Sequence, residues 1–315
     1  MSRIKRIIDC TKSDFERMSA MELKESIFAA EGRTILSQNY VRSHQGLLDG
    51  ITNTELEAAF GADLILLNGY SLDENQSIPG LHGMRLVDVK KLVNRPLGIY
   101  LECPDTNASV AGSIGAAYEG FLSSDRVVSA KNIEECLKEG ADFIILGGNP
   151  GSATSFDSII AATKLAKSIA GDRTLIFSGK WEDGTIEKVL GDPLAKRPAN
   201  EIIKELIDAG ADVITLPAPG SRHGISTDMI RACVEFTHSY KPGTLAMVFL
   251  DSSVEGADVD TIREIALKMK ETGADIHAIG DAGFACVAVP ENLYQMSVTI
   301  RGRRFTWKRM AGNNR

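Results

Sequence analysis

The chain has 315 residues and a formal net charge of −7, which argues against a general nucleic-acid-binding protein because such a protein needs a basic surface. It has no run of roughly 20 apolar residues, as a membrane span requires, and its N-terminus lacks the apolar core of a signal peptide. The five cysteines are scattered and never spaced as CxxC: Cys10, Cys103, Cys136, Cys233 and Cys286. We therefore expect a cytoplasmic protein with reduced thiols, without a disulfide framework or a zinc site.

The chain begins with a segment, residues 1–31, that precedes the first predicted strand and includes a helical stretch from Ser19 to Ala30. We expect this short helical extension to cap the bottom of the domain that follows, residues 32–315, or to pack on its outside. The second domain takes up the rest of the chain as a single unit.

A Gly-Ala-Asp repeat then organises the chain. Each copy follows an amphipathic helical pattern and precedes an apolar run, and the copies occupy residues 61–63, 140–142, 210–212 and 273–275. A glycine just past a helix can adopt the left-handed conformation that ends the helix. The repeat therefore predicts four sharp turns from a helix into a buried strand.

Four further apolar runs alternate with the strands of the repeat, at residues 33–41, 96–104, 174–180 and 244–251. Runs that are apolar without strict alternation are typical of parallel strands covered on both faces. Eight alternating strands and helices in one chain predict an α/β fold, a closed (β/α)8 TIM barrel.

The predicted loops differ in length at the two ends of the strands. Turns from helix into strand are short, whereas the longest segments from strand into helix cover residues 69–85, 102–126, 178–199 and 280–296. A barrel enzyme builds its active site from the loops that follow the strands. We expect the working face there, although long loops can also form contacts in a homo-oligomer.

The C-terminal residues 297–311 indicate a short strand followed by a basic, aromatic tail. Its charges are Arg301, Arg303, Arg304, Lys308 and Arg309. We expect a solvated or subunit-contact face, which serves as a dimer contact or a lid and has no chemistry of its own.

The pattern of strands, helices and Gly-Ala-Asp turns resembles the (β/α)8-barrel enzymes that process small phosphorylated or carbonyl metabolites, such as aldolases, epimerases, synthases and decarboxylases. The chain also looks like a family of uncharacterised bacterial proteins sometimes labelled haloacid dehalogenase-like hydrolases. That activity needs Asp-x-Asp-x-Thr/Val directly after the first strand, whereas the nearest match, residues 258–261, opens a late helix. Fold analogy alone does not establish activity.

Two glycine-containing segments at strand ends are candidate anion-binding loops. GGNPGSATS, residues 147–155, and GDAGFA, residues 280–285, present backbone amides next to helix starts. The alternative for the first is a plain turn with a capping residue. The predicted anion-binding residues are Gly148, Asn149, Gly151, Ser152, Gly280, Asp281 and Gly283, with Asn68 and Ser252 at two further strand ends.

Three residues suggest catalysis or anion binding at the ends of strands five and six. Arg222 can hold a planar anion and His223 can transfer protons near neutral pH, although this segment can also be an exposed loop. Lys180 can form a Schiff base with a carbonyl, bind an anion as a fixed cation, or simply face solvent.

Three carboxylates, Glu102, Asp251 and Asp281, follow separate strands. They can bind Mg²⁺, provide a general base, or hydrogen-bond loop amides. The sequence leaves the cofactor unknown, with Mg²⁺ as the candidate, and the histidines are too dispersed for a histidine-rich metal cluster.

These residues lead to a hypothesis of a lyase (aldolase-like) or an isomerase that acts on a small anionic carbonyl metabolite, phosphorylated or carboxylated. Lys180, His223, Glu102 and Asp251 are the candidate catalytic residues. The alternatives are a Mg²⁺-dependent hydrolase of a phosphorylated substrate and a non-catalytic barrel that binds a metabolite or scaffolds a complex.

Overall fold

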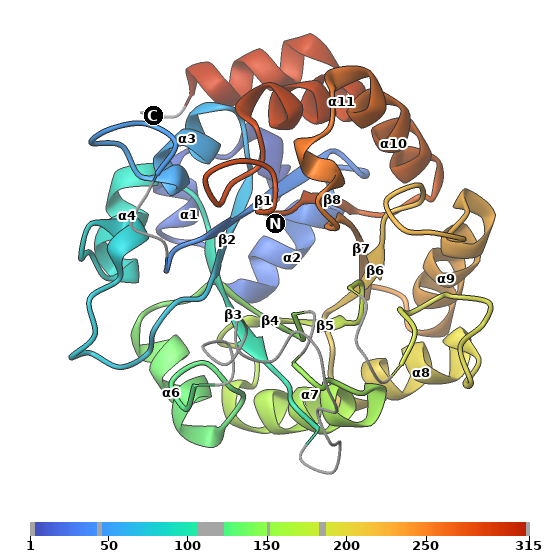
Figure 1. Ribbon diagram of the computed structural model, residues 1–315. Helices are drawn as coiled ribbons and strands as arrows, with labels where there is room; N and C mark the ends of the chain where they lie inside the picture. The colour runs from blue at the N-terminus through green and yellow to red at the C-terminus, as the bar shows by residue number, and fades with distance from the viewer. Residues whose placement is uncertain (1–3, 43–45, 106–122, 150–151, 183–186, 313–315) are drawn as a thin grey trace.

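The computed structural model describes residues 4–42, 46–105, 123–149, 152–182 and 187–312. Eight parallel strands close into a barrel in sequence order, because β8 pairs with β1 (Figure 1). This confirms the predicted (β/α)8 barrel. The strands are β1 (Thr34–Tyr40), β2 (Leu64–Asn68), β3 (Leu97–Glu102), β4 (Phe143–Gly147), β5 (Leu175–Gly179), β6 (Val213–Pro217), β7 (Leu245–Leu250) and β8 (Ile276–Ile279).

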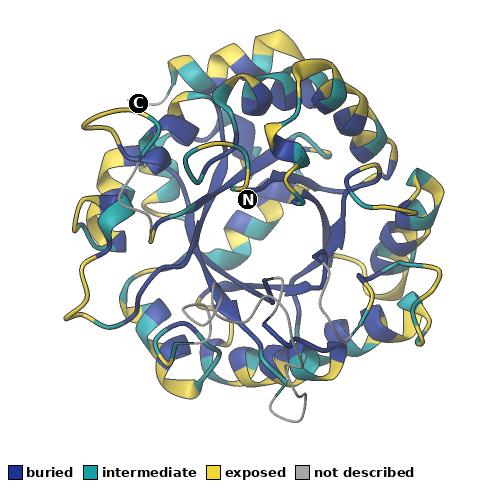
Figure 2. Ribbon diagram, viewed as in Figure 1, coloured by how far each residue is buried: buried dark blue, intermediate teal, exposed yellow. Residues whose placement is uncertain are grey.

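Helices surround the barrel, with their buried sides toward the strands and their exposed sides outward (Figure 2). The α-helices are α1 (Lys12–Phe15), α2 (Ala20–Phe28), α3 (Asn53–Ala59), α4 (Leu86–Val93), α6 (Ala130–Lys138), α7 (Phe156–Ala170), α8 (Ala199–Ala209), α9 (Thr227–Tyr240), α10 (Val259–Glu271) and α11 (Pro290–Ala311). Three short 3-10 helices are η1 (Ile7–Asp9), η2 (Pro79–Leu81) and η4 (Val254–Gly256). Within the described ranges, no helix has both the length and the apolar character to cross a bilayer.

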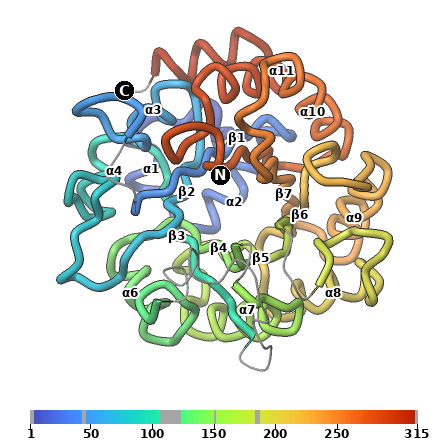
Figure 3. The backbone as a smooth tube through the Cα atoms, in the orientation of Figure 1, coloured from blue at the N-terminus to red at the C-terminus, as the bar shows by residue number. Residues whose placement is uncertain are grey.

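The inside of the barrel is a separate apolar core. Alternate residues of each strand point inward, and the inward side chains pack on one another, with Phe143 stacked on Phe177 at a ring-centroid distance of 5.0 Å. The N-terminal segment closes one end, because Ile7 and the α2 residues Leu23 and Ile27 belong to the same core. Figure 3 shows α2 within the ring of strands in this view. The opposite end carries the loops that follow the strands.

The Gly-Ala-Asp repeats have one structural role in all four copies. Their glycines have positive φ angles of 102°, 79°, 107° and 81°, as predicted for residues that end a helix. Each aspartate then accepts a hydrogen bond from a backbone N–H of the preceding strand. The bonds are Ile35 N to Asp63 (2.9 Å), Leu97 N to Asp142 (2.8 Å), Ile176 N to Asp212 (3.2 Å) and Ala246 N to Asp275 (2.8 Å).

Each of these aspartates also has a basic partner at the N-terminal end of the barrel. The partners of the last three are Lys90 for Asp142, Lys24 and Lys167 for Asp212, and His238 for Asp275. Asp63 differs because it is fully buried and pairs with two arginines, Arg301 at 2.5 Å and Arg309 at 2.7 Å. The repeat thus joins neighbouring strands and holds fixed charges in place.

The C-terminal prediction was wrong in two respects. Residues 297–311 form the second part of helix α11, which is kinked at Gly302 (φ 76°, ψ 162°), and contain no strand. Arg301 and Arg309 are buried on Asp63 and so do not belong to a solvated face, whereas Arg303, Arg304 and Lys308 are exposed. The ion pairs of Arg301 and Arg309 with the distant Asp63 are tertiary contacts, which a local sequence pattern does not reveal.

Candidate active site at the mouth of the barrel

Strand alternation places a layer of polar side chains above the apolar core of the barrel. Leu36, Leu66, Tyr100 and Phe249 point into the core, so the residue two positions later on each strand points to the same side. These residues are Gln38, Asn68, Glu102 and Asp251, and each is at most 4% exposed. The sequence thus gathers polar groups from four strands at the carboxyl-terminal mouth.

An aromatic floor separates this polar layer from the core. The Trp181 ring stacks on Phe249 at a centroid distance of 5.2 Å and meets Tyr100 edge-on at 5.8 Å. A Cβ atom on Gly147 would lie only 2.7 Å from the Trp181 ring, so glycine leaves room for the indole. The indole N–H donates to the Asp251 carboxylate at 3.0 Å, which ties the floor to the polar layer.

Glu102 is a buried acid of the mouth. Burial raises the pKa of its carboxyl to about 7, against the hydrogen bonds that favour the charged form. The Asn149 backbone N–H donates to Glu102 Oε2 at 3.0 Å, and the Asn149 side-chain amide donates to Oε1. A carboxyl that titrates near neutral pH is suited to take up and return protons.

Several buried polar atoms at the mouth have no hydrogen-bond partner within the described part of the chain. They are the Tyr100 hydroxyl, Gln38 Oε1, Asn68 Oδ1 and Thr215 Oγ1. Burial pushes the pKa of the Tyr100 phenol well above its ordinary value, so this hydroxyl keeps its proton as a donor. Buried polar groups are otherwise nearly always satisfied, so these atoms indicate where a polar ligand or water binds.

A second group of carboxylates lies on the β5–β8 side. Burial, and then the charge of Glu255, push the pKa of Asp251 well above its ordinary range, and burial raises that of Asp281 to about 7. Burial also raises the pKa of Glu182 well above its ordinary value. The charges that act on Glu182 include those of Asp251, Asp281, Glu102 and Arg222. These groups therefore converge around one space.

Arg222 provides a positive charge within this group. Its Nη2 lies 3.8 Å from Glu182 Oε1 and donates to the backbone carbonyl of Asp251 at 2.9 Å. The neighbouring His223 is exposed. Of the pair predicted from sequence, only the arginine is held among the carboxylates.

The amides of both predicted anion loops donate to carboxylates of the protein itself. Glu102 accepts from Asn149 N, while Glu255 accepts from Ser252 N and Ala282 N, both at 3.0 Å. An anion about 6 Å from one such charge would be repelled by about 3 kcal/mol at an effective dielectric constant near 20. These loops are therefore poor places for a phosphate while the carboxylates are ionised.

The glycines of these loops make room for protein atoms. A Cβ on Gly148 would lie 1.9 Å from Thr154 Oγ1, one on Gly280 would lie 2.5 Å from Asp251 Oδ1, and one on Gly283 would lie 2.8 Å from a backbone oxygen. Ser152 is buried and shares a 2.9 Å hydrogen bond with Thr154. Gly151 lies outside the described residues.

Lys180 is buried directly after β5, and its Nζ donates to the Glu182 carbonyl at 3.4 Å. Ser178, two residues earlier, bonds Thr163 of helix α7, outside the barrel wall. Because side chains alternate between the two faces of a strand, the Lys180 side chain should also point to the outer side of the barrel wall.

The candidate metal ligands Glu102, Asp251 and Asp281 do not form a metal-binding group. Among the described residues, no three or more His, Cys, Asp or Glu side chains are placed to hold an ion together. Asp281 instead accepts a hydrogen bond from Asn68 Nδ2 at 2.9 Å, and Asp251 accepts from Trp181.

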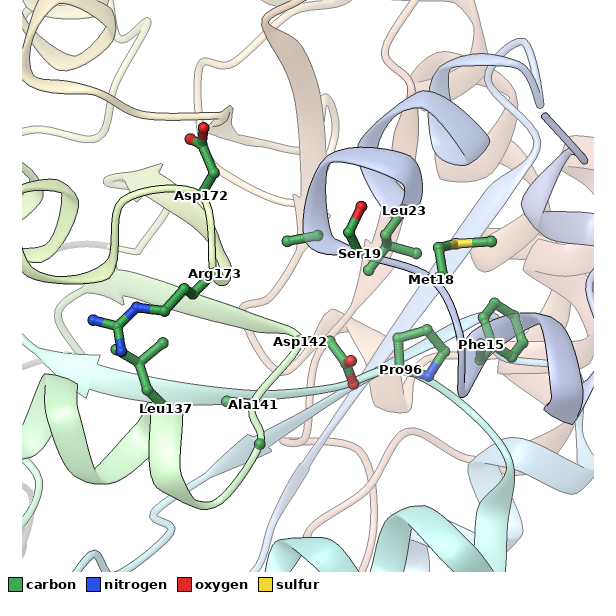
Figure 4. A pocket seen from close by; sticks show the side chains of 12 residues that line it. Phe15, Met18, Ser19, Leu23, Pro96, Leu137, Ala141, Asp142, Asp172 and Arg173 are labelled. Carbon is green, nitrogen blue, oxygen red and sulfur yellow. The ribbon is translucent and has the colours of Figure 1, made fainter. Parts of the chain in front are cut away.

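A separate pocket of about 310 Å³ lies at the N-terminal end, between the N-terminal segment and the turns before β4 and β5 (Figure 4). Phe15 and Met18 line it on one side, and Asp142 and Arg173 on the other. Asp142 is already engaged by Lys90 at 2.8 Å. This pocket lies at the opposite end of the barrel from the polar layer at the mouth.

Sequence reasoning missed several residues of this site. Tyr100, Trp181, Glu182 and Glu255 were not singled out, although Tyr100 precedes Glu102 by two residues on one strand. Strand alternation could have found Tyr100. The same alternation, continued from Phe177 past the end of β5, could have found Trp181. The burial of Glu255 depends on loop conformation, which no local pattern indicates.

Comparison with solved structures establishes the fold. The carboxyl transferase domain of Rhizobium etli pyruvate carboxylase is similar with a TM-score of 0.52 and 13% identity, over 99% of this chain and 52% of that chain. A structure of the same domain with 3-hydroxypyruvate gives 0.51 and 15%, over 97% and 51%. An archaeal fructose 1,6-bisphosphate aldolase gives 0.50 and 12%, over 89% and 98%.

This chain thus spans about half the length of the carboxyl transferase chains. No curated protein matches the sequence. Residues 8–315 match one protein family, which covers nearly the whole barrel together with its N-terminal segment. The chain therefore belongs to the family described as domain of unknown function DUF7916.

Proposed function

We propose that this protein is a lyase or an isomerase that transfers a proton next to the carbonyl group of a small anionic metabolite. The observation that carries the proposal is Glu102, a buried carboxyl with a pKa of about 7 at the barrel mouth, two residues along β3 from Tyr100, whose hydroxyl has no hydrogen-bond partner among the described residues. A base and a neutral donor on one strand match the two demands of enolate formation, which are to remove a proton and to stabilise the oxygen.

In this mechanism, the ionised Glu102 carboxylate removes a proton from the carbon next to the carbonyl. The electron pair of the broken C–H bond forms the C=C bond of the enolate, and the carbonyl oxygen takes the negative charge. The Tyr100 hydroxyl donates a hydrogen bond to that oxygen. Protonation of the enolate at the same carbon from the other face completes an epimerisation. Where that carbon carries a hydroxyl, the hydroxyl loses its proton to become the new carbonyl, the former carbonyl oxygen gains a proton, and protonation at the former carbonyl carbon completes an isomerisation. An aldolase-like lyase instead forms the enolate by cleaving a C–C bond.

The aromatic floor supports this role because it excludes water beneath the reacting atoms and strengthens electrostatic interactions above it. Asn149 positions Glu102 through two hydrogen bonds. Two enzymes of similar fold, an aldolase of fructose 1,6-bisphosphate and a carboxyl transferase with pyruvate in one structure, are named for carbonyl compounds. Their likeness to this chain lies in the fold.

The test is solvent exchange, because it requires only the first proton transfer. Purified protein is incubated in D₂O with a panel of 2-keto acids and sugar phosphates, and loss of the α-proton signal is followed by proton NMR. We expect catalysed exchange with at least one compound. Glu102→Gln should reduce the rate by about 10²- to 10⁴-fold, the typical contribution of a general base.

The matched control is Glu235→Gln, on the exposed side of α9, which should exchange at the wild-type rate. Circular dichroism must show that both variants fold. Full activity in a folded Glu102→Gln variant would remove the proposed base. Binding of a panel compound without any exchange would favour a non-catalytic metabolite-binding barrel.

Lys180 provides the alternative route, in which its amine condenses with the carbonyl, water leaves, and the resulting Schiff base forms an enamine in place of the enolate. Borohydride would then fix a substrate on this residue, and mass spectrometry would locate the added mass. Because Lys180 continues the outward alternation of β5, we expect no adduct there. An adduct that disappears in Lys180→Ala would replace the direct mechanism with a Schiff-base aldolase.

A further inference from the structure

Two amide side chains of the mouth, Gln38 on β1 and Asn68 on β2, are oriented by one carboxylate. Asn68 Nδ2 donates a hydrogen bond to Asp281 Oδ2 at 2.9 Å, and the Gln38 side chain also hydrogen-bonds the Asp281 carboxylate. Because an ionised carboxylate only accepts hydrogen bonds, both amides present their NH₂ groups to Asp281. The two carbonyl oxygens of these amides are thereby left for other partners.

These carbonyl oxygens, Gln38 Oε1 and Asn68 Oδ1, have no hydrogen-bond partner among the residues that the structure describes. Both residues are buried, at 2% and 3% exposure. Buried polar atoms nearly always have a partner, and a buried acceptor without one costs stability. A ligand that donates a hydrogen bond to each oxygen would remove this cost.

The two amides lie on the side of the mouth next to the proposed base. Gln38 and Asn68 both belong to the inward-facing polar layer, and Leu67 of β2 pairs in register with Ile99 of β3. This pair sets Asn68 at the level of the residue two positions before Glu102. With strands about 4.8 Å apart and a rise of about 3.3 Å per residue, the Cα atoms of Asn68 and Glu102 are about 8 Å apart. One small metabolite can therefore reach both side chains.

The surroundings of the two oxygens favour a neutral hydrogen-bond donor over an anion. The amide N–H groups, which could hold a phosphate or a carboxylate, are already bonded to Asp281. The charge of Asp281 also acts on Glu182 and on Asp251, so the neighbouring space is acidic. The groups that remain for a ligand are two acceptors, and the donors that small carbonyl metabolites most commonly carry are hydroxyl groups.

We infer that Gln38 Oε1 and Asn68 Oδ1 form a subsite that accepts hydrogen bonds from hydroxyl groups of the substrate, which is therefore a hydroxylated carbonyl compound. Asp281 is a positioning residue of this subsite, because it holds both amides by their N–H groups. The inference rests on the proposed function only in assigning the bound molecule to the reaction of Glu102.

The test measures binding of three 2-keto acids that differ only in their hydroxyl groups. They are 2-oxopentanoate, 4-hydroxy-2-oxopentanoate and 4,5-dihydroxy-2-oxopentanoate, with both C4 enantiomers of the last two. They share the carboxylate, the carbonyl and the C3 protons, so a difference in dissociation constant reports the hydroxyls. Titration calorimetry should show that each hydroxyl of the preferred enantiomer tightens binding about fivefold, the typical contribution of one hydrogen bond.

Gln38→Met and Asn68→Leu replace the amides with apolar side chains of similar size. Each should bring the ratio of dissociation constants between the unsubstituted and hydroxylated compounds toward one. A merely structural role would not change this ratio, because a smaller folded fraction affects all three compounds equally. Asn75→Leu, at an exposed asparagine of the loop after β2, is the matched control and should keep the wild-type ratio.

A wild-type protein that gains no affinity from either hydroxyl would overturn the inference even if neither variant folds, and so would the wild-type ratio in both folded variants. The two proposals fail separately. Binding that depends on the hydroxyls, without proton exchange at C3 in D₂O, would leave the subsite in place and remove the enzymatic role of Glu102. Exchange that depends on Glu102 and is equally fast for all three compounds, with equal dissociation constants, would keep the base and overturn the subsite.

Discussion

Asp63 is the residue whose loss the structure predicts to be most costly at the N-terminal end of the barrel. Its carboxylate is fully buried and is paired with Arg301 and Arg309, whose side chains are 0% and 3% exposed. Asp63→Asn keeps an oxygen for Ile35 N and removes the charge. Two buried guanidinium groups would then lack a counter-charge, which typically costs about 3–5 kcal/mol.

Asp142→Asn is the matched variant because Asp142 occupies the same place in another Gly-Ala-Asp repeat. Its partner Lys90 has a side chain that is 32% exposed and can turn to water when the charge is lost. We therefore expect a cost of about 1 kcal/mol. With about 2–4 °C of Tm per kcal/mol for chains approaching this size, Tm should fall by roughly 10 °C in Asp63→Asn and roughly 3 °C in Asp142→Asn.

The assay is thermal unfolding followed by circular dichroism at low ionic strength. Arg301→Met added to Asp63→Asn should recover part of the loss, since it removes one of the uncompensated charges. Equal destabilisation by the two aspartate variants would refute the reasoning. The cost would then come from the hydrogen bond to the strand, which both aspartates make, and the burial of the basic partner would have no effect on stability.

Three further predictions follow from buried carboxyls. The pKa of Glu102 is about 7, and only its ionised form accepts a proton, so the rate of proton exchange should rise with pH through about 7. The pH profile of Glu102→Gln should lack this inflection. An unchanged profile in that variant would assign the titration to another group. Burial raises the pKa of Glu57 to about 8 from 4.5, so the stability that its protonated form contributes is complete below pH 4.5 and is lost as pH rises through 8. Glu57→Gln should therefore lose less free energy of unfolding between pH 5 and 9 than wild type or the exposed Glu235→Gln, and an equal loss would exclude Glu57 as the cause. The pKa of Asp251 is likewise raised, which means that its ionised form is disfavoured in the folded protein. Asp251→Asn should therefore raise Tm at pH 8 more than at pH 4. A Tm at pH 8 below that of wild type would show that the ionised form is well compensated.

The fold could be predicted because its signals are local and repeated. The glycine that ends a helix and the apolar run that follows are adjacent in sequence, so four Gly-Ala-Asp turns and four further runs were enough to count eight strands. Helix α11 could not be predicted in the same way. Residues 297–311 have little helical amphipathicity, and their conformation depends on Asp63, more than 230 residues earlier in the chain.

The candidate site could be predicted only where strand ends determine it. Glu102, Asn149, Asp251 and Asp281 follow strands whose positions the sequence indicates, so their arrival at one mouth was foreseeable. Their partners were not foreseeable, because Glu255 reaches the loop amides of Ser252 and Ala282 through tertiary folding. An amide-rich loop in sequence therefore looks the same whether a ligand or the protein's own carboxylate occupies it.

The two ends of the barrel use acidic residues in opposite ways. At the N-terminal end, each repeat aspartate has a basic partner and accepts a hydrogen bond from a strand N–H, both of which favour its ionised form, although burial still raises the pKa of Asp142. At the mouth, Glu102, Asp251 and Asp281 have raised pKa values, and Arg222 is the cation that acts on Glu182 and Asp251. Incompletely compensated acids cost stability, and perturbed pKa values of this kind gather at functional sites. This difference between the acids at the two ends of the barrel, more than any single residue, indicates that the catalytic site lies at the mouth.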